Sequence, residues 1–194
     1  MTEILQKEID YINRTNSSFI GQKIKEVFYE ELNYESEPEC WNYSNNIHSV
    51  DMNVLLQIEN GKLLQIKWDD EFYCYGIGFA EISEIKIRDG INTINVSENS
   101  NWKSLIGKTI TSIDIYWDES ENQEYQTKLG IMLPKGKKQQ FKLPLSWKLN
   151  FLNEYVFISA FEIDEDGNNY YWADHLTLFF KEDDYLISCK NNLE

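Results

Sequence analysis

The chain has 194 residues, of which 42% are hydrophobic and 14% aromatic, enough for a packed core and too apolar for a disordered chain. Its 33 acidic residues outnumber its 18 basic ones, which gives a formal net charge of −15. Because binding to phosphate groups requires cationic side chains, this balance disfavours nucleic acid and anionic membranes as partners.

The cysteines and the N-terminal residues indicate the compartment. Cys40, Cys74 and Cys189 are too few and too scattered for a disulfide scaffold, so we expect a reducing environment. Residues 1–8 include acids where a signal peptide needs a basic region, and no stretch approaches the roughly 20 apolar residues that span a bilayer. We therefore expect a cytoplasmic protein.

The first predicted element is a helix over residues 2–14, because Leu5, Ile9 and Ile12 recur on one face. The segment that follows it occurs twice in the chain. Residues 18–27, SFIGQKIKEV, reappear at 104–113 as SLIGKTITSI. Each copy begins with a polar entry to a single turn that a glycine closes, Gly21 in the first copy and Gly107 in the second. We predict two tandem related units, 1–97 and 98–194, which could also form one continuous domain.

Both copies then have the same spacing of apolar residues. These residues occur in steps of three and then two, at Ile24, Val27 and Tyr29 in one copy and at Ile110, Ile113 and Ile115 in the other. Since a regular half-buried strand repeats every two residues, the step of three predicts a β-bulge in each copy.

Two glycine-centred turns predict hairpins after these strands. Apolar residues alternate on both sides of Asn60-Gly61, a strong hairpin signal. The second unit has a weaker signal at Lys135-Gly136, between 129–133 and 139–143, where Pro134 and the polar Gln139 interrupt the pattern. An edge strand or a longer loop is the alternative there.

Further strands are predicted along the rest of the chain, at 82–88, at 155–163 and as a last hairpin over 176–180 and 185–189. Frequent strand signals with little helix between them favour antiparallel sheets. We therefore predict an α+β protein, mainly antiparallel β, with a short N-terminal helix.

The motifs for metal binding and catalysis are weak. Asp164 and Asp166 precede Gly167 as in a calcium loop, but the twelfth position is Ala173, where an EF-hand needs an acid, so a plain turn is the stronger interpretation. No local motif supports Cys40 and His48 as a nucleophile and base. Asp174-His175 resembles the acid and base of a triad, but the sequence has no Gly-x-Ser-x-Gly motif to supply a serine nucleophile. We predict no cofactor and no catalytic residues.

Charge gives the strongest indication of function. The acids are spread evenly, with 17 in residues 1–97 and 16 in 98–194, and such a field favours encounter with a basic partner. Two groups place aromatic residues beside acids at the ends of predicted strands, as protein-binding surfaces do. The candidate partner-binding residues are Trp68, Asp69, Asp70 and Glu71 in one group and Trp117, Asp118, Glu119 and Glu121 in the other.

The turn at 104–108, the strand leading to 116–119 and the hairpin around Asn60-Gly61 resemble small, acidic, β-rich bacterial proteins, including immunity proteins that are encoded beside secreted toxins. The resemblance implies a cytoplasmic inhibitor without catalytic residues, which blocks a cognate toxin domain by binding it.

Two other classes of function stay open. One is a β-sandwich module that binds a carbohydrate or another small ligand through exposed Trp and Tyr side chains. The other is a hydrolase whose carboxyl groups come together only in space. Trp and Tyr side chains that line a concave groove would favour the first, whereas burial of Trp68 and Trp117 would contradict it. Two carboxyl groups that converge in a pocket would favour the second.

Overall fold

The computed structural model describes residues 3–33, 41–72, 75–128, 131–164, 166–171 and 175–190. Three helices and twelve strands form the described part: α1 Glu3–Phe19, β1 Ile24–Leu32, β2 Ile47–Val50, β3 Asn53–Ile58, β4 Leu63–Asp69, β5 Gly76–Ile82, β6 Ile91–Asn95, α2 Ser100–Leu105, β7 Ser112–Lys128, β8 Ile131–Asn150, β9 Tyr155–Ser159, β10 Glu162–Ile163, β11 Asn169–Tyr170, β12 Leu176–Phe179 and α3 Glu182–Lys190. Every pair of neighbouring strands is antiparallel, which confirms the predicted α+β class.

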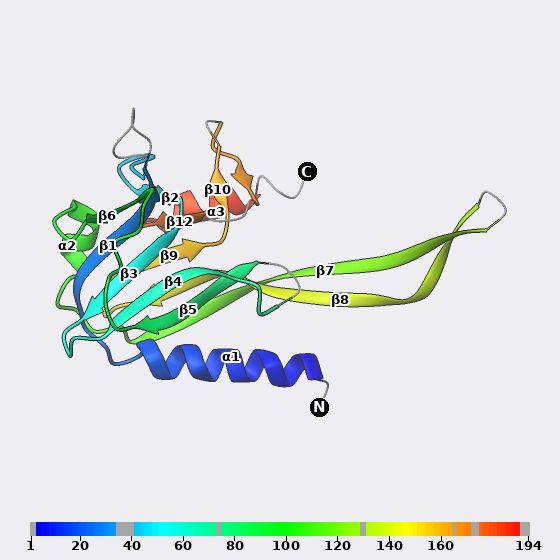
Figure 1. The fold of residues 1–194 in the computed structure, drawn as a ribbon, viewed down its shortest axis with the longest axis horizontal. Helices are drawn as coiled ribbons and strands as arrows, with labels where there is room; N and C mark the ends of the chain where they lie inside the picture. The colour runs from blue at the N-terminus through cyan, green and yellow to red at the C-terminus, as the bar shows by residue number, and fades with distance from the viewer. Residues whose placement is uncertain are drawn as a thin grey trace.

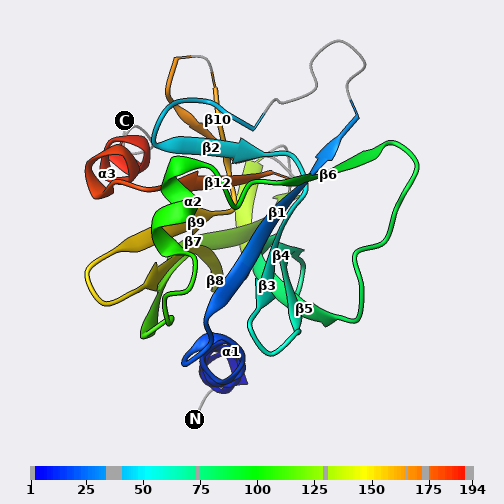
Figure 2. The ribbon, with the colours of Figure 1, turned by 90° about the vertical axis from the view of Figure 1, so that its left-hand side faces the viewer.

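The strands form two five-stranded sheets and one small hairpin. The first sheet has the order β5-β4-β3-β1-β6, and the second has the order β2-β12-β9-β8-β7 (Figures 1 and 2). Each half of the chain thus runs as an antiparallel meander, β1-β3-β4-β5 in one sheet and β7-β8-β9-β12 in the other. The exception is β2, which comes from the first half and pairs with β12 in the second sheet.

One buried cluster contains side chains of both sheets and of the helices α1 and α2. It includes Phe19 of α1, Val27 and Leu56 of the first sheet, and Trp147 and Ile158 of the second. The boundary between residues 97 and 98 stays a prediction, because the two halves share this core.

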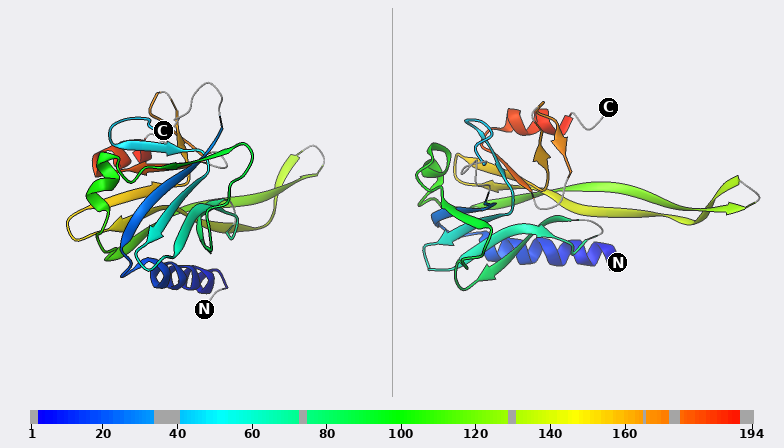
Figure 3. Two further views of the ribbon diagram at one scale, coloured as in Figure 1. Left: turned by 60° about the vertical axis from the view of Figure 1, so that its left-hand side comes forward. Right: turned by 45° about the horizontal axis from the view of Figure 1, so that its top comes forward.

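The N-terminal helix connects the two sheets. The hydroxyl of Tyr11 donates a hydrogen bond to the carbonyl of Ile77 in β5 and accepts one from Nε1 of Trp147 in β8 at 2.9 Å. α1 lies beside β5 and the base of the β7–β8 hairpin (Figures 1 and 3). It continues to Phe19, five residues beyond the predicted end, because the polar Asn16-Ser17-Ser18 segment forms its last turn.

The repeated segments meet in space in a nearly symmetric way. The N–H of Gly21 donates to the carbonyl of Ile110 at 2.9 Å, and the N–H of Gly107 donates to the carbonyl of Ile24 at 2.8 Å. Lys23 and Thr109 form an antiparallel bridge between these two hydrogen bonds. Both glycines have the predicted positive φ, 84° and 76°, but each follows a helix, α1 or α2, and not the predicted single turn.

The predicted bulge is confirmed in the first copy only. The register between β1 and β3 shifts between Ile24 and Glu26. In the second copy β7 begins only at Ser112, and its register shifts lie further along, at Tyr116/Trp117 and Asn122/Glu124.

The Asn60-Gly61 hairpin is confirmed between β3 and β4, with Gly61 at φ 90°. The Lys135-Gly136 hairpin is wrong, because both residues lie inside β8, which pairs with β7 along most of its length. The ribbon of β7 and β8 extends far from the body (Figure 1).

Two further predictions need correction. Residues 83–88 form no strand, and the strand of this region is β6, after the Asp89-Gly90 turn. The predicted strand at 185–189 is part of helix α3, which begins with Glu182, Asp183 and Asp184. Acids in a first turn favour a helix through its dipole, and one face of α3 packs Tyr185 against Phe157 and Phe179.

Candidate functional site

Trp68 of the first candidate group is mostly covered. Its residue exposure is 9%, and its Nε1 donates to the carbonyl of His175. Two tyrosine rings lie beside it, Tyr75 with a centroid separation of 5.9 Å and Tyr171 with one of 5.3 Å. These tyrosines are 48% and 44% exposed. We call Trp68, Tyr75 and Tyr171 the aromatic patch.

The aromatic patch joins the two halves of the chain. Tyr75 precedes β5, whereas Tyr171 follows β11, and the Tyr171 hydroxyl donates to the carbonyl of Tyr75. Sequence reasoning predicted Trp68 but missed both tyrosines, which are far apart in the chain and carry no local motif. The exposed ring area beside Trp68 belongs to them.

The acids after Trp68 have different roles. Asp70 is exposed. Asp69 accepts from the N–H of Glu71 at 2.9 Å and forms an ion pair with Lys67 at 3.0 Å. Glu71 forms an ion pair with Arg14 of α1. Asp69 and Glu71 therefore have partners within the chain, whereas Asp70, two residues after Trp68, is exposed.

The second candidate group lies at the base of the β7–β8 ribbon. Trp117 is half-buried between Tyr11 and Phe72, with ring centroids 5.6 and 5.2 Å away. Asp118 and Glu119 are exposed, and Glu119 forms an ion pair with Lys142 at 2.8 Å. Glu121 lies on β7, and its side chain is outside the described part. The contact role of this group stays a prediction.

A Ser-His-Asp arrangement occurs where β2 pairs with β12. Ser49 Oγ lies 2.6 Å from Nε2 of His175, and Nδ1 of His175 lies 3.7 Å from Oδ1 of Asp51. Burial lowers the pKa of His175, and the negative charges of Glu162 and Asp51 partly offset this decrease. The imidazole is therefore neutral at pH 7.

This arrangement differs from a catalytic triad in two ways. The distance of 3.7 Å is longer than a hydrogen bond, so Asp51 does not orient the ring as a triad acid does. Ser49 lies in a paired strand opposite Thr177 and is 8% exposed, with little access for a substrate. The three residues form a polar bridge between β2 and the start of β12.

A second histidine is buried in the core. Nδ1 of His48 lies 2.7 Å from the hydroxyl of Tyr29, which also accepts from Nε1 of Trp102. Burial lowers the pKa of His48 to about 4. Cys40, which sequence reasoning considered with His48, is outside the described residues. The ring of His48 thus packs as a neutral group.

The calcium candidate forms a turn. Oδ1 of Asp164 accepts from the N–H groups of Asp166 and Asn168 at 3.0 and 2.8 Å. These hydrogen bonds, chiefly that from Asn168, lower the pKa of Asp164. Among the described residues no three His, Cys, Asp or Glu side chains are placed to hold a metal ion.

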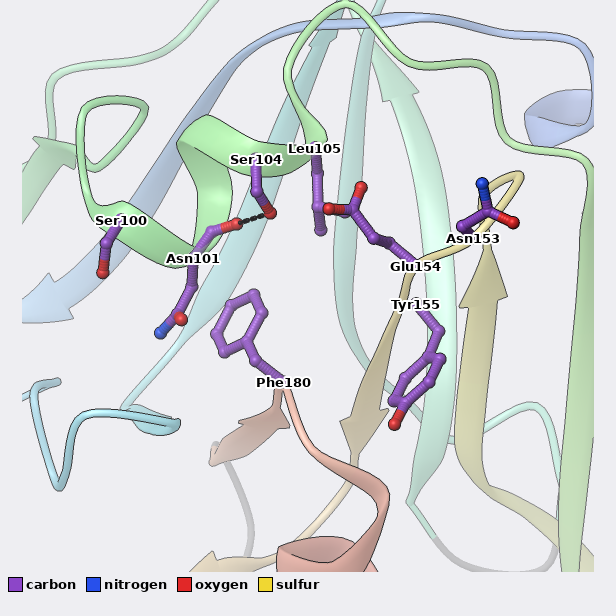
Figure 4. A pocket seen from close by; sticks show the side chains of 8 residues that line it. All are labelled: Ser100, Asn101, Ser104, Leu105, Asn153, Glu154, Tyr155 and Phe180. Atoms are coloured by element: carbon purple, nitrogen blue, oxygen red, sulfur yellow. Dashed lines mark hydrogen bonds between the residues drawn. The ribbon is translucent and has the colours of Figure 1, made fainter.

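Several surface grooves open in the described part. One of about 410 Å³ lies between α2, the β8–β9 connection and Phe180 (Figure 4). One of about 500 Å³ lies over the first sheet, where the buried carboxylate of Glu30 accepts from Asn53 and pairs with Arg88. The third, of about 410 Å³, lies around Lys108 and Leu152.

The grooves bear on the small-ligand alternative. No tryptophan lines any of the three grooves. Trp41, Trp102 and Trp147 are buried in the core instead. The tryptophans therefore give the carbohydrate interpretation no support.

Comparisons with protein-family models, curated proteins and solved structures found no match. Within the described residues, none of the helices combines the length and the apolar character that crossing a membrane requires.

Proposed function

We propose that this protein is a non-enzymatic binding protein that recognises a basic protein partner, and that it acts in the cytoplasm as an immunity-type inhibitor of a toxin domain. The aromatic patch carries the proposal, because two half-exposed tyrosines over a fixed tryptophan have the character of an interface hot spot. Tyrosines lose little conformational entropy on binding, and their rings offer a large contact area.

The charge around the patch supports a basic partner. Asp70, two residues after Trp68 of the patch, is exposed, and acids are nearly equally dense in both halves of the chain. A field of this sign raises the association rate of a cationic protein and falls with ionic strength. Inhibition by binding needs only such a surface.

The test starts with the purified chain on a support. A partner retained from the native cells at low salt is identified and purified, and its affinity for the chain is measured at low and high salt. The proposal requires a partner with a net positive charge, an affinity that falls as salt rises, and loss of the partner's toxicity when both proteins are produced together. An acidic partner, salt-independent binding or undiminished toxicity would contradict it.

A further inference from the structure

The long strand β7 has one edge with which no described strand pairs. It is the last strand of the second sheet, with β8 as its only neighbour among the described strands. β9 pairs with β8 only from Ser146 to Asn150, so β7 and β8 continue beyond Trp117 as a two-stranded ribbon away from the body (Figures 1 and 3). An isolated two-stranded ribbon is only marginally stable in water, and an open edge is a template for another strand.

We propose that a second copy of this chain covers this edge, through antiparallel pairing of β7 with β7 of the second copy. The two-fold axis would pass near Gln123, so that the two sheets join into one continuous sheet. Such an interface uses the same strand on both copies and therefore closes at two copies. The arms would lie side by side, each ending near the body of the other copy.

The order of charges along β7 favours this register. Acidic residues occupy positions 118, 119, 121 and 124, whereas the end of the strand carries Lys128. Antiparallel pairing about Gln123 places Asp118 opposite Lys128 of the second copy and Glu121 opposite Tyr125. No two acids are then directly opposite, which avoids the repulsion that destabilises like-charged cross-strand pairs.

The other edge of the ribbon is less suited to self-pairing. β8 carries Lys135, Lys137 and Lys138 within four consecutive positions, and antiparallel pairing of two β8 strands about this part would place lysine against lysine. The irregular register of β7 and β8 falls between Asn122 and Glu124. The proposed axis lies at this point, and β7 pairs in regular register with β8 from Trp117 to Asn122 on one side of it and from Glu124 to Lys128 on the other.

The first experiment measures mass in solution by light scattering and sedimentation over a range of concentrations. The chain of 23.0 kDa should reach twice this mass. Asp118→Lys and Lys128→Asp should each raise the dissociation constant of the dimer about tenfold, since every dimer contains two such pairs. The double variant, with both charges exchanged, should restore the dimer. A monomer at all concentrations, or a double variant weaker than both single ones, would overturn the proposal.

The second experiment tests the register by cross-linking. A cysteine at the axis, Gln123→Cys, should join two copies by a disulfide under mild oxidation, since directly opposed Cβ atoms lie about 5 Å apart. Asp118→Cys is the matched control, because its counterpart would lie about 30 Å away along the strand. The parent chain measures any cross-linking by native cysteines. Equal cross-linking of both variants, or of neither, would exclude pairing about Gln123 and indicate another occupant of the edge.

Discussion

The N–H of Gly21 in the first unit donates a hydrogen bond to the carbonyl of Ile110 in the second unit at 2.9 Å. In return, the N–H of Gly107 donates one to the carbonyl of Ile24 at 2.8 Å. The two hydrogen bonds connect equivalent positions of the repeat. The repeated sequence therefore connects the two halves of the chain, where α1 is followed by β1 and α2 is followed by β7.

Alanine at either glycine should destabilise the protein by a similar amount. A Cβ at Gly21 or Gly107 would meet nothing within 4 Å, so the cost is that of the positive φ, about 1 kcal/mol each. Urea denaturation measures this loss in the free energy of unfolding. Gly78→Ala is the contrast, because its Cβ would lie 2.2 Å from Cβ of Asp69, and overpacking there should cost about 3 kcal/mol. A smaller loss for Gly78→Ala than for Gly21→Ala would contradict this assignment.

Tyr11→Phe should lower the free energy of unfolding by about 3 kcal/mol, since the buried Nε1–H of Trp147 and the carbonyl of Ile77 both lose their hydrogen bonds to the hydroxyl. The apolar ring contacts of residue 11 are kept in this variant. Tyr116→Phe, at a residue that is 40% exposed, serves as the control and should change stability by less than about 0.5 kcal/mol. Equal effects of the two substitutions would show that the Tyr11 hydroxyl does not connect α1 to both sheets.

Stability should fall in mild acid because of His48. Its pKa is about 4 in the folded protein, against 6.5 for an ordinary histidine. Below pH 6.5 the unfolded chain takes up the proton first, so stability that is complete above this pH is lost as the pH falls toward 4. The full difference is about 3 kcal/mol.

Urea denaturation at pH 7 and at pH 4.5 measures this loss, with His48→Asn as the comparison. The variant should lose less stability between the two pH values, whatever its stability at pH 7. Burial also lowers the pKa of His175, so this residue acts in the same direction, and some pH dependence should remain in the variant. An unchanged pH dependence in His48→Asn would refute the assignment to His48.

The aromatic patch should dominate partner binding. Tyr75→Ala and Tyr171→Ala should each weaken the affinity at least about tenfold, the usual effect of removing a hot-spot side chain. Leu152→Ala removes another exposed apolar side chain, 84% exposed and outside the patch, and should leave the affinity unchanged. Titration calorimetry measures all three, with circular dichroism to check folding. Equal losses in the three variants would argue against a localised hot spot.

Asp70→Asn should act mainly on the rate of association. The substitution removes an exposed charge two residues after Trp68 and keeps the size of the side chain. We expect slower association at low salt and convergence with the parent chain at high salt, measured by stopped flow. A change confined to the dissociation rate would show that Asp70 makes a direct contact instead.

Local patterns predicted those parts of the fold in which each residue interacts with its neighbours in sequence. The glycine turns at Gly21 and Gly107, the bulge after Ile24 and the Asn60-Gly61 hairpin follow from backbone preferences and the two-residue strand period. The same rules failed at Lys135-Gly136 and at 185–189. There, pairing along β7 and the packing of Tyr185 against Phe157 prevailed over the local signal.

The sequence by itself determined an antiparallel, strongly acidic protein with a repeated segment in which a glycine turn leads into a strand. Only the tertiary structure decided that the repeats are hydrogen-bonded to each other, that Tyr75 and Tyr171 lie beside Trp68, and that β7 pairs with β8 alone among the described strands. Composition and periodicity depend on short segments, whereas these relationships arise from contacts between residues far apart in the chain. No local pattern specifies which distant side chains share a surface.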